Sequence, residues 1–390
     1  MIDGGFSRGK YKLSIVFLVF SLLLVALNVW VVSDSKIQSF FSGDGVELSS
    51  DADAVQSDSS QIIEEDCGNL YLLTGNNLTL DSNCTVEDEN VATCKSGVIT
   101  AIAPGQTRVS VMEDTRCKYW TLTVDDYQSI VAPMGRKLQL ETLNSCTQWS
   151  CSDTGCAEID NTGKLTPVSV GECSVTASDA DGRQYGWKIS VKRTAYITID
   201  DWPDENTIVM LDIMKKYGIK ATFFLASQKD HMDIYKRIID EGHAIGNHTK
   251  THNLSVIYES SSNLCHNVEL MEEFLNEKFG VSTKLFRFPG GYFANSPAQR
   301  EGYKQLTAQG YRVFDWTCTV DDVNFTKRED IMKKFKDTLD EDVEIILMHN
   351  KKSTAGVFEE VVLYLIEKDY VCLPLDEQCP TFDFVHGWQE

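Results

Sequence analysis

An apolar stretch that runs directly into two adjacent carboxylates constrains the fold of this chain most strongly. The stretch begins at Tyr196, reaches Asp200 and Asp201, and stops at Pro203. Parallel α/β folds place their chemistry at such strand ends, where side chains are held rigidly at the mouth of the sheet. Because successive side chains of a strand point in opposite directions, the two carboxylates face different ways. One carboxylate can therefore hold a metal ion while the other faces a reacting atom.

Two histidines four residues apart, His248 and His252, follow the third predicted strand of this region. An aspartate together with a His-x-x-x-His pair supplies three metal ligands and leaves coordination positions open for water and substrate. The sequence therefore predicts a catalytic metal site formed by one aspartate of this pair together with His248 and His252.

The chain from residue 193 to 390 alternates apolar stretches with amphipathic segments of helical length. Gly218, Gly242 and Gly310 follow three of these segments, as expected for the left-handed cap that reverses the chain after a helix. Repeated strand–helix–strand units predict an α/β fold with a parallel sheet, here a distorted (β/α)7 barrel that is closed or nearly closed. The predicted strands span residues 195–200, 220–227, 243–247, 285–289, 311–317, 343–349 and 370–375.

Each polar cluster of this region lies at the end of a predicted strand. The motifs in chain order are Thr198-x-Asp200-Asp201, His248-Thr-x-x-His252, Arg287-x-Pro289, Asp315-Trp316 and Leu347-x-His349. Any one of these motifs is unspecific, but five in order at strand ends form a specific signature. The ordered set closely resembles the NodB-type polysaccharide deacetylases, carbohydrate esterase family 4, over roughly residues 194–386.

The resemblance implies a role for each residue at the first three strand ends. Asp200 would be the catalytic base, and Asp201, His248 and His252 would bind a divalent metal, with Zn²⁺ expected and Co²⁺ or Ni²⁺ as alternatives. Arg287 would pair with Asp200 and hold it ionised.

The resemblance also assigns the surroundings of the substrate. The backbone N–H of Gly290 would help to bind the oxyanion of the reacting carbonyl. Trp316 and Leu347 would form the wall of the pocket for the acetyl methyl group, and Tyr292 belongs to the same substrate-binding set.

The last motif implies an acid for the leaving group. His349 would be the general acid, a task that suits histidine because its pKa lies near the working pH. Asp322 would be the carboxylate that orients His349, with Asp321 and Asp315 as the alternatives.

The chain departs from the family pattern at three positions of the groove. Trp202 stands in place of the usual glycine after the aspartate pair, and Lys250 replaces an aromatic or small residue. Val323 stands where many members carry a second tryptophan. These positions bear on substrate preference more than on activity.

The N-terminal part of the chain contains one uncharged apolar run, residues 13–32, which is long enough to span a bilayer as a helix. Arg8, Lys10 and Lys12 precede it, so the positive-inside rule puts residues 1–12 in the cytoplasm. We therefore expect a single-pass protein of the cell membrane with its other domains outside. A cleaved signal peptide is the alternative, but no small-x-small cleavage site follows the run.

Three further segments separate the apolar run from residue 193. Residues 33–66 are acidic and rich in serine, which predicts a linker. Residues 67–125 and 126–192 form an internal repeat in which Gly97 matches Gly163 and Gly105 matches Gly171. Short strands punctuated by glycine resemble bacterial Ig-like modules of the Big2 type, two small β-sandwiches. We expect a spacer, with carbohydrate binding as the alternative.

The chain has 12 cysteines, all beyond the apolar run. An even number in an oxidising compartment favours disulfides, although their pairing cannot be assigned from the sequence. A structural zinc site is the alternative, but no pair has C-x-x-C spacing.

Together these features predict an exported, membrane-anchored, metal-dependent enzyme that removes N-acetyl groups from an amino-sugar polymer. A position beside the wall suggests peptidoglycan as the substrate. One alternative is an esterase that removes O-acetyl groups from xylan or another glycan, and another is a wall-binding protein whose barrel has lost activity. The net charge of −22 argues against a nucleic-acid partner, which would require a basic face.

Overall fold

The computed structural model describes residues 62–389, which belong to one compact unit, Ser60–Glu390. The predicted cytoplasmic tail (1–12), the predicted membrane helix (13–32) and nearly all of the predicted linker (33–66) lie outside the described residues. Within residues 62–389, none of the helices has both the length and the apolar character needed to cross a membrane.

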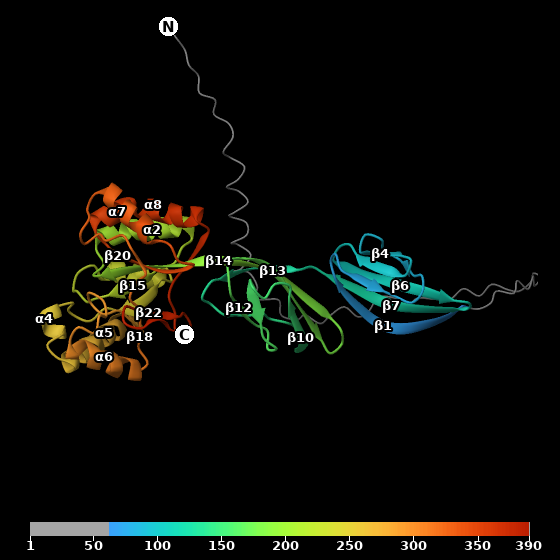
Figure 1. The fold of residues 1–390 in the computed structure, drawn as a ribbon, viewed down its shortest axis with the longest axis horizontal. Helices are drawn as coiled ribbons and strands as arrows, with labels where there is room; N and C mark the ends of the chain where they lie inside the picture. The colour runs from blue at the N-terminus through green and yellow to red at the C-terminus, as the bar shows by residue number, and fades with distance from the viewer. Residues whose placement is uncertain (1–61, 390) are drawn as a thin grey trace, which may run out of the picture. The chain divides into compact units, whose positions relative to one another are not determined.

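The first β unit consists of seven strands in two sheets (Figure 1, blue to cyan). One sheet has the order β1-β7-β6-β3 and the other the order β2-β5-β4. Buried Leu72, Ile99, Val109 and Leu122 belong to the hydrophobic core of this unit. The strands are β1 (Ile63–Leu73), β2 (Asn77–Thr79), β3 (Thr85–Val86), β4 (Ala92–Lys95), β5 (Val98–Ala101), β6 (Gly105–Glu113) and β7 (Arg116–Asp125).

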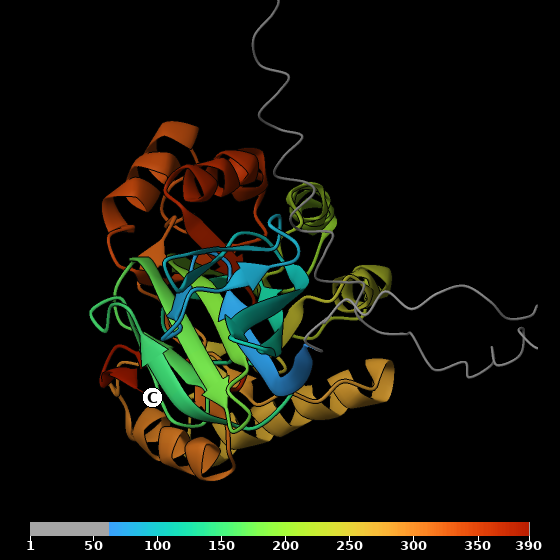
Figure 2. The same ribbon diagram turned by 90° about the vertical axis from the view of Figure 1, so that its right-hand side faces the viewer.

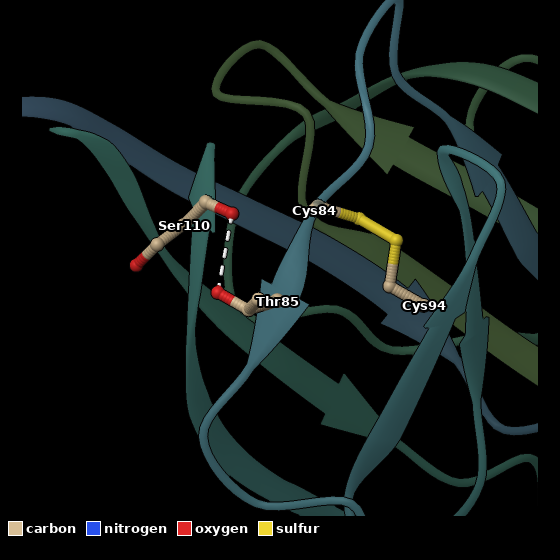
Figure 3. Close-up of a disulfide and its surroundings, with 4 residues drawn as sticks. All are labelled: Cys84, Thr85, Cys94 and Ser110. Carbon is tan, nitrogen blue, oxygen red and sulfur yellow. Dashed lines mark hydrogen bonds between the residues drawn. A yellow bond between two sulfur atoms is a disulfide. The ribbon is translucent and has the colours of Figure 1, made fainter. Parts of the chain in front are cut away.

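A disulfide between Cys84 and Cys94 connects the two sheets of this unit (Figure 3). Cys84 directly precedes β3, Cys94 lies in β4, and the hydroxyl of Thr85 donates to the carbonyl oxygen of Ser110 on β6 at 3.5 Å. The prediction that the cysteines favour disulfides is met by this one pair, and the ten other cysteines are thiols in the structure.

The second β unit repeats this arrangement. Its larger sheet contains β10, β13, β14 and β8, and its smaller sheet has the order β11-β12-β9. The paired glycines of the repeat share their backbone geometry, since Gly97 and Gly163 have φ of 79° and 83°. The strands are β8 (Gln128–Pro133), β9 (Leu138–Gln139), β10 (Cys146–Cys151), β11 (Ala157–Ile159), β12 (Lys164–Pro167), β13 (Gly171–Asp179) and β14 (Gln184–Asp201).

Strand β14 continues from the second β unit into the C-terminal part without interruption. Its first half pairs with β13 and β8, and its second half pairs with three parallel strands, β15, β20 and β21. Residues 194–200 are all buried, as expected for a strand of a parallel sheet that is covered on both faces. The predicted domain boundary between residues 192 and 193 therefore lies inside this strand.

The C-terminal part contains a parallel sheet with the order β18-β17-β16-β15-β14-β20-β19. Its strands after β14 are β15 (Thr222–Leu225), β16 (Ala244–Asn247), β17 (Leu285–Phe286), β18 (Arg312–Val313), β19 (Cys318–Thr319), β20 (Val343–His349) and β21 (Tyr370–Leu373). The predicted parallel sheet is therefore present, although strands β17 and β18 are shorter than predicted.

The seven strands leave the predicted barrel open at one position, and one predicted strand has a different place in the sheet. The seventh strand of the sheet is β19, whereas β21, predicted as the last strand, lies beside residues 193–196 of β14. Among the described residues β18 and β19 do not pair. The reason is that Phe314, just after β18, bridges to Phe382 of a C-terminal hairpin formed by β22 (Thr381–Asp383) and β23 (Gly387–Gln389).

Helices flank this sheet in two groups. Helices α2, α7 and α8 lie together on one side, and α4, α5 and α6 lie on the other (Figures 1 and 2). Helix α2 begins directly after the aspartate pair, where Asp204 caps its N-terminus with a capping box. The helices are α2 (Glu205–Tyr217), α3 (Met232–Asp240), α4 (Leu254–Ile257), α5 (Ser261–Phe279), α6 (Pro297–Ala308), α7 (Arg328–Thr338) and α8 (Lys352–Glu367).

Candidate active site

The structure brings the three predicted metal ligands together at the strand ends. Asp201 ends β14, His248 directly follows β16, and His252 lies in the loop before α4. Oδ1 of Asp201 lies 3.9 Å from Nε2 of His248 and 3.4 Å from Nε2 of His252. All three ligand atoms lie within 4.8 Å of one another. One cation can therefore contact all three side chains.

The chemistry of these donors fits a divalent cation. Oδ1 of Asp201 is buried, and none of the described residues gives it a hydrogen bond, which is costly for a carboxylate oxygen. Nδ1 of His248 lies 2.9 Å from the carbonyl oxygen of Arg287 and must donate to it, so Nε2 keeps its lone pair free. Burial lowers the pKa of His248 to about 3, which keeps the ring neutral as a metal ligand requires.

The backbone around the site is strained. Asp201, Thr249 and His252 have φ of 84°, 68° and 50°, a region that residues with a Cβ rarely adopt. Such positions cost about 1–3 kcal/mol each and cluster at functional sites. The side chain of Asn247 supports the turn, because its Oδ1 accepts from the N–H of Thr249 at 3.0 Å and its Nδ2 donates to Val268 at 2.9 Å.

The indole of Trp202 packs against His252, one of the candidate metal ligands. The two rings meet edge to face with their centroids 5.7 Å apart. Nε1 of Trp202 donates to the carbonyl oxygen of Ser227 at 3.0 Å, which holds the indole in place. The residue that departs from the family pattern here therefore restricts the orientation of a metal ligand.

Arg287 is completely buried and anchors the predicted base. Its Nη1 donates to Oδ1 of Asp200 at 2.8 Å and to the hydroxyl of Thr198 at 2.7 Å. Its Nε donates to the carbonyl oxygen of Phe314 at 2.7 Å, and its Nη2 to that of Asp315 at 3.0 Å. The planar guanidinium thus joins three strand ends through a fixed set of donors.

Arg287 pairs with Asp200 as the resemblance implies, but burial of Asp200 opposes its ionised form. Burial raises the pKa of Asp200 above its ordinary value, and the charge of Arg287 opposes this shift without cancelling it. Oδ2 of Asp200 lies 3.6 Å from Nε2 of His248, so it faces the metal ligands. A bound cation would add positive charge at that side of the carboxylate, which favours its ionised form.

The predicted acid, His349, lies directly beside the predicted base. The register of β14 and β20 pairs Asp200 with His349 at the ends of the two strands. Nδ1 of His349 lies 2.7 Å from Oδ1 of Asp322. Of the three carboxylates considered for this contact, Asp321 instead accepts from Asn324, and Asp315 accepts from two backbone N–H groups.

These contacts set the protonation of the pair. Burial alone would raise the pKa of Asp322, but hydrogen bonds from His349 and Thr354 lower it overall. Burial opposes the charged form of His349, but Asp322 and the nearby Asp200 raise its pKa above the ordinary value. His349 therefore keeps its proton at a higher pH than a free histidine does.

A tight turn places the predicted oxyanion donor. The N–H of Gly291 donates to the carbonyl oxygen of Phe288 at 2.8 Å, which puts Pro289 and Gly290 at the centre of a β-turn. Gly290 has φ of 77°, as the third position of such a turn requires. A Cβ added to Gly290 would meet nothing within 4 Å, so the space beside it is open to a ligand.

The remaining predicted substrate contacts lie around this turn. Leu347 of β20 is nearly buried and pairs in register with Thr198, two residues before the base. Trp316 follows β18 and is half-buried, with the guanidinium of Arg287 5.9 Å from its ring centroid. Tyr292 is buried, and its N–H donates to Asp315.

Three supporting residues were not assigned these roles from the sequence. Thr198 and Asp315 belong to the motifs, but the hydroxyl of Thr198 that holds Arg287 was given no role. Asp315 was considered only as a partner of His349, whereas it holds the turn through the N–H of Tyr292. Asn247 directly precedes His248. Its position at the end of a predicted strand was the signal that could have pointed to its supporting role.

Comparison with known proteins places this site in a family. The family model "Polysaccharide deacetylase" matches residues 188–311. A peptidoglycan-N-acetylglucosamine deacetylase of Bacillus cereus is 31% identical over 190 residues, which cover 46% of this chain and 68% of that protein. A second protein of that description from Bacillus cereus is 36% identical over 135 residues, 33% of this chain and 46% of that protein. The chain therefore belongs to the polysaccharide deacetylase family.

A solved structure of a polysaccharide deacetylase is similar to part of this chain. The crystal structure of the polysaccharide deacetylase Bc1974 from Bacillus cereus is 27% identical, covers 50% of this chain and 98% of that chain, and has a TM-score of 0.47. The chain spans about half to two thirds of the length of the curated relatives it matches. The family model begins only at residue 188, after most of the two β units.

Proposed function

We propose that this protein hydrolyses the N-acetyl groups of an N-acetylglucosamine polymer, with peptidoglycan as the substrate, and releases acetate. The observation that carries the proposal is the pairing of Asp200 with His349 at two adjacent strand ends, beside the ligand set of Asp201, His248 and His252. A base and an acid next to a cation site are the groups that amide hydrolysis requires.

The residues of the chain divide the reaction between them. Asp200 takes the proton of the attacking water, and the N–H of Gly290 donates to the carbonyl oxygen as negative charge develops on it. The C–N bond then breaks, His349 gives its proton to the leaving nitrogen, and acetate and a free amino sugar result. One oxyanion donor is worth about 3–4 kcal/mol in such reactions.

A divalent metal would be held by Asp201, His248 and His252. When bound, it polarises the carbonyl and lowers the pKa of water. Two imidazoles and one carboxylate form the donor set of catalytic zinc sites, so we propose Zn²⁺, with Co²⁺ or Ni²⁺ as alternatives.

We also propose that the enzyme is exported and anchored in the cell membrane by residues 13–32. The apolar run and the three basic residues before it support this orientation. Peptidoglycan follows from the description of the Bacillus cereus relatives and from a position beside the cell wall.

Acetate release by the full-length chain tests the proposal. We compare three substrates: purified peptidoglycan, N-acetylglucosamine oligomers and acetylated xylan. Each is assayed without a chelator, with a chelator, and with Zn²⁺ added back after the chelator. We expect acetate from the amino-sugar substrates, loss with the chelator, recovery with Zn²⁺ and strongly reduced release with Asp200→Asn. Release from acetylated xylan alone would assign the esterase activity instead, and no release from any substrate would refute an enzymatic role.

A further inference from the structure

Three aromatic rings converge beside the oxyanion turn. A Cβ built on Gly291 would lie 3.0 Å from Cε2 of Phe384, 3.1 Å from Cε2 of Phe293 and 3.2 Å from Cη2 of Trp316. Gly291 directly follows Gly290, the predicted oxyanion donor. We call Phe293, Trp316 and Phe384 the aromatic wall, which thus begins one residue from the reacting group.

The aromatic wall is ordered but not part of the core. Phe293 and Phe384 stack with their centroids 4.8 Å apart and their planes 12° apart. Trp316 stands nearly perpendicular to Phe384, at 4.8 Å and 88°. Phe293 is nevertheless 47% exposed, and Phe384 and Trp316 are only partly buried. These three partly exposed rings in mutual contact therefore offer an apolar surface that a ligand can contact.

The C-terminal hairpin that carries Phe384 is fixed to the oxyanion turn through one buried carboxylate. Asp315 accepts from the N–H of Tyr292 at 3.1 Å and from the N–H of Phe384 at 3.1 Å. Its own N–H donates to the carbonyl oxygen of Phe382 at 2.7 Å. The ring of Phe384 and the turn that holds Gly290 are therefore positioned by the same residue.

A second buried carboxylate holds the far side of the hairpin. Asp383 accepts from the hydroxyl of Tyr303 on α6 at 3.1 Å and from the N–H of His386 at 2.8 Å. The hairpin is thus attached on both sides before any ligand arrives. A binding surface that is already in place costs less conformational entropy when the ligand binds.

We propose that the aromatic wall is a subsite that stacks against the pyranose ring of a sugar next to the one being deacetylated. The proposal rests on the proposed function. The faces of aromatic rings carry partial negative charge and pack against the C–H groups of a sugar ring, and the wall itself carries no ionisable side chain. The wall lies one residue from the N–H proposed to bind the acetyl carbonyl, a position from which it can contact a neighbouring sugar of the same polymer.

The C-terminal hairpin brings Phe384 to the site from far along the chain. Phe293 lies within residues 188–311, to which the family model matches, whereas Trp316 and Phe384 lie after them. The bridge of Phe314, just after β18, to Phe382 of β22 holds the start of the hairpin beside the strand ends. In this proposal the hairpin therefore supplies one ring of the subsite.

The test compares Phe384→Ala and Phe293→Ala with Val385→Ala in the full-length protein. Val385 lies on the same hairpin and is 46% exposed, so it controls for disturbance of the hairpin. We measure kcat/KM on an N-acetylglucosamine pentamer and on the single-sugar methyl glycoside. We expect about a tenfold loss on the pentamer for either phenylalanine variant, a loss below about twofold on the single sugar, and recovery in Phe384→Trp.

Two outcomes would overturn the subsite. Equal losses on both substrates would show that the wall only supports the fold, and no loss on the pentamer would show that no sugar contacts it. If the wild-type protein released no acetate at all, the proposed function would fail, but the subsite would still be testable. Quenching of tryptophan fluorescence by the pentamer would then be weaker in Phe384→Ala, and equal affinities would refute the proposal.

Discussion

Nδ1 of His349 lies 2.7 Å from Oδ1 of Asp322, and the backbone N–H of His349 donates to Oδ2 of the same carboxylate at 2.8 Å. Two contacts from one residue fix both the position and the rotation of the ring. Because the ionised carboxylate only accepts, Nδ1 carries a proton, and Nε2 is left to hold or release the proton that the reaction needs.

Asp322→Asn removes the charge beside His349 but keeps a side chain of the same shape. The pKa of His349, now raised by Asp322, should fall, so the acid form should be lost at a lower pH. We expect the alkaline limb of kcat/KM against pH to move down by about one pH unit or more. Asp321→Asn is the matched control, and an alkaline limb that stays in place in Asp322→Asn would contradict the assignment.

Asp200→Asn should separate metal binding from proton transfer. The amide keeps a hydrogen-bond acceptor for Arg287 but cannot take a proton from water, so turnover should fall by about 10²–10⁴-fold. Metal content, measured by elemental analysis after dialysis, should equal that of the wild-type protein, since Asp201 and both histidines remain. Normal turnover in this variant would remove Asp200 from the mechanism.

His252→Ala should weaken metal binding itself. The variant lacks one of the three protein ligands. Mutation of a residue that only orients a ligand already lowers metal affinity by about 10–100-fold, so we expect zinc affinity to fall by about 100-fold or more. Competition with a fluorescent zinc chelator gives the affinity. His266→Ala is the control, because His266 is exposed on α5 and outside the ligand set. Equal zinc affinity in the two variants would show that the ligand set is wrong.

His243 should make the stability of the fold sensitive to acid. Burial lowers the pKa of His243 to about 4, and its Nδ1 accepts from the N–H of Ala221 at 3.1 Å. The unfolded chain therefore binds the proton first, so stability is full above about pH 6.5 and is lost as the pH falls towards 4. The free energy of unfolding should fall by about 3 kcal/mol over this window, because each pH unit between the two pKa values contributes about 1.4 kcal/mol.

His243→Asn checks this assignment, because Oδ1 of asparagine can accept the same hydrogen bond without titrating. The variant should be less stable at neutral pH, since it loses the edge-to-face contact of His243 with Phe223. Its free energy of unfolding, from urea titrations at several pH values, should fall less steeply between pH 6.5 and 4. An identical slope in both proteins would assign the acid sensitivity to other groups.

The strand boundaries were predictable from the sequence because apolar stretches alternate with amphipathic segments, and glycines mark the points where the chain reverses. The aspartate pair after an apolar run indicates where β14 ends, and the glycines after amphipathic segments indicate where β15 and β16 begin. Once the ends of parallel strands meet at one edge, Asp201 and His248 must approach each other. The pairing of Asp200 with Arg287 came from the family resemblance, and the structure shows it at 2.8 Å.

The remaining features depend on non-local contacts or on strain. Nothing in the residues around His252 signals its φ of 50°, because this conformation is imposed by the packing of the loop. The sequence also placed Asp315 among the partners of His349, whereas its carboxylate accepts from residues 23 and 69 positions away. The place of β21 beside residues 193–196 of β14 was not predicted, because this pairing joins segments far apart in the chain.

The continuity of β14 decides how this protein can be divided. A fragment that started at residue 194 would carry its charged amino terminus at a buried position and would lose the ladders with β13 and β8. Protease cleavage also needs an accessible, flexible segment, and the ladder from Gln184 to Asp201 offers none between the second β unit and the aspartate pair. The catalytic part is therefore best released at a cut before β8, with the second β unit still attached.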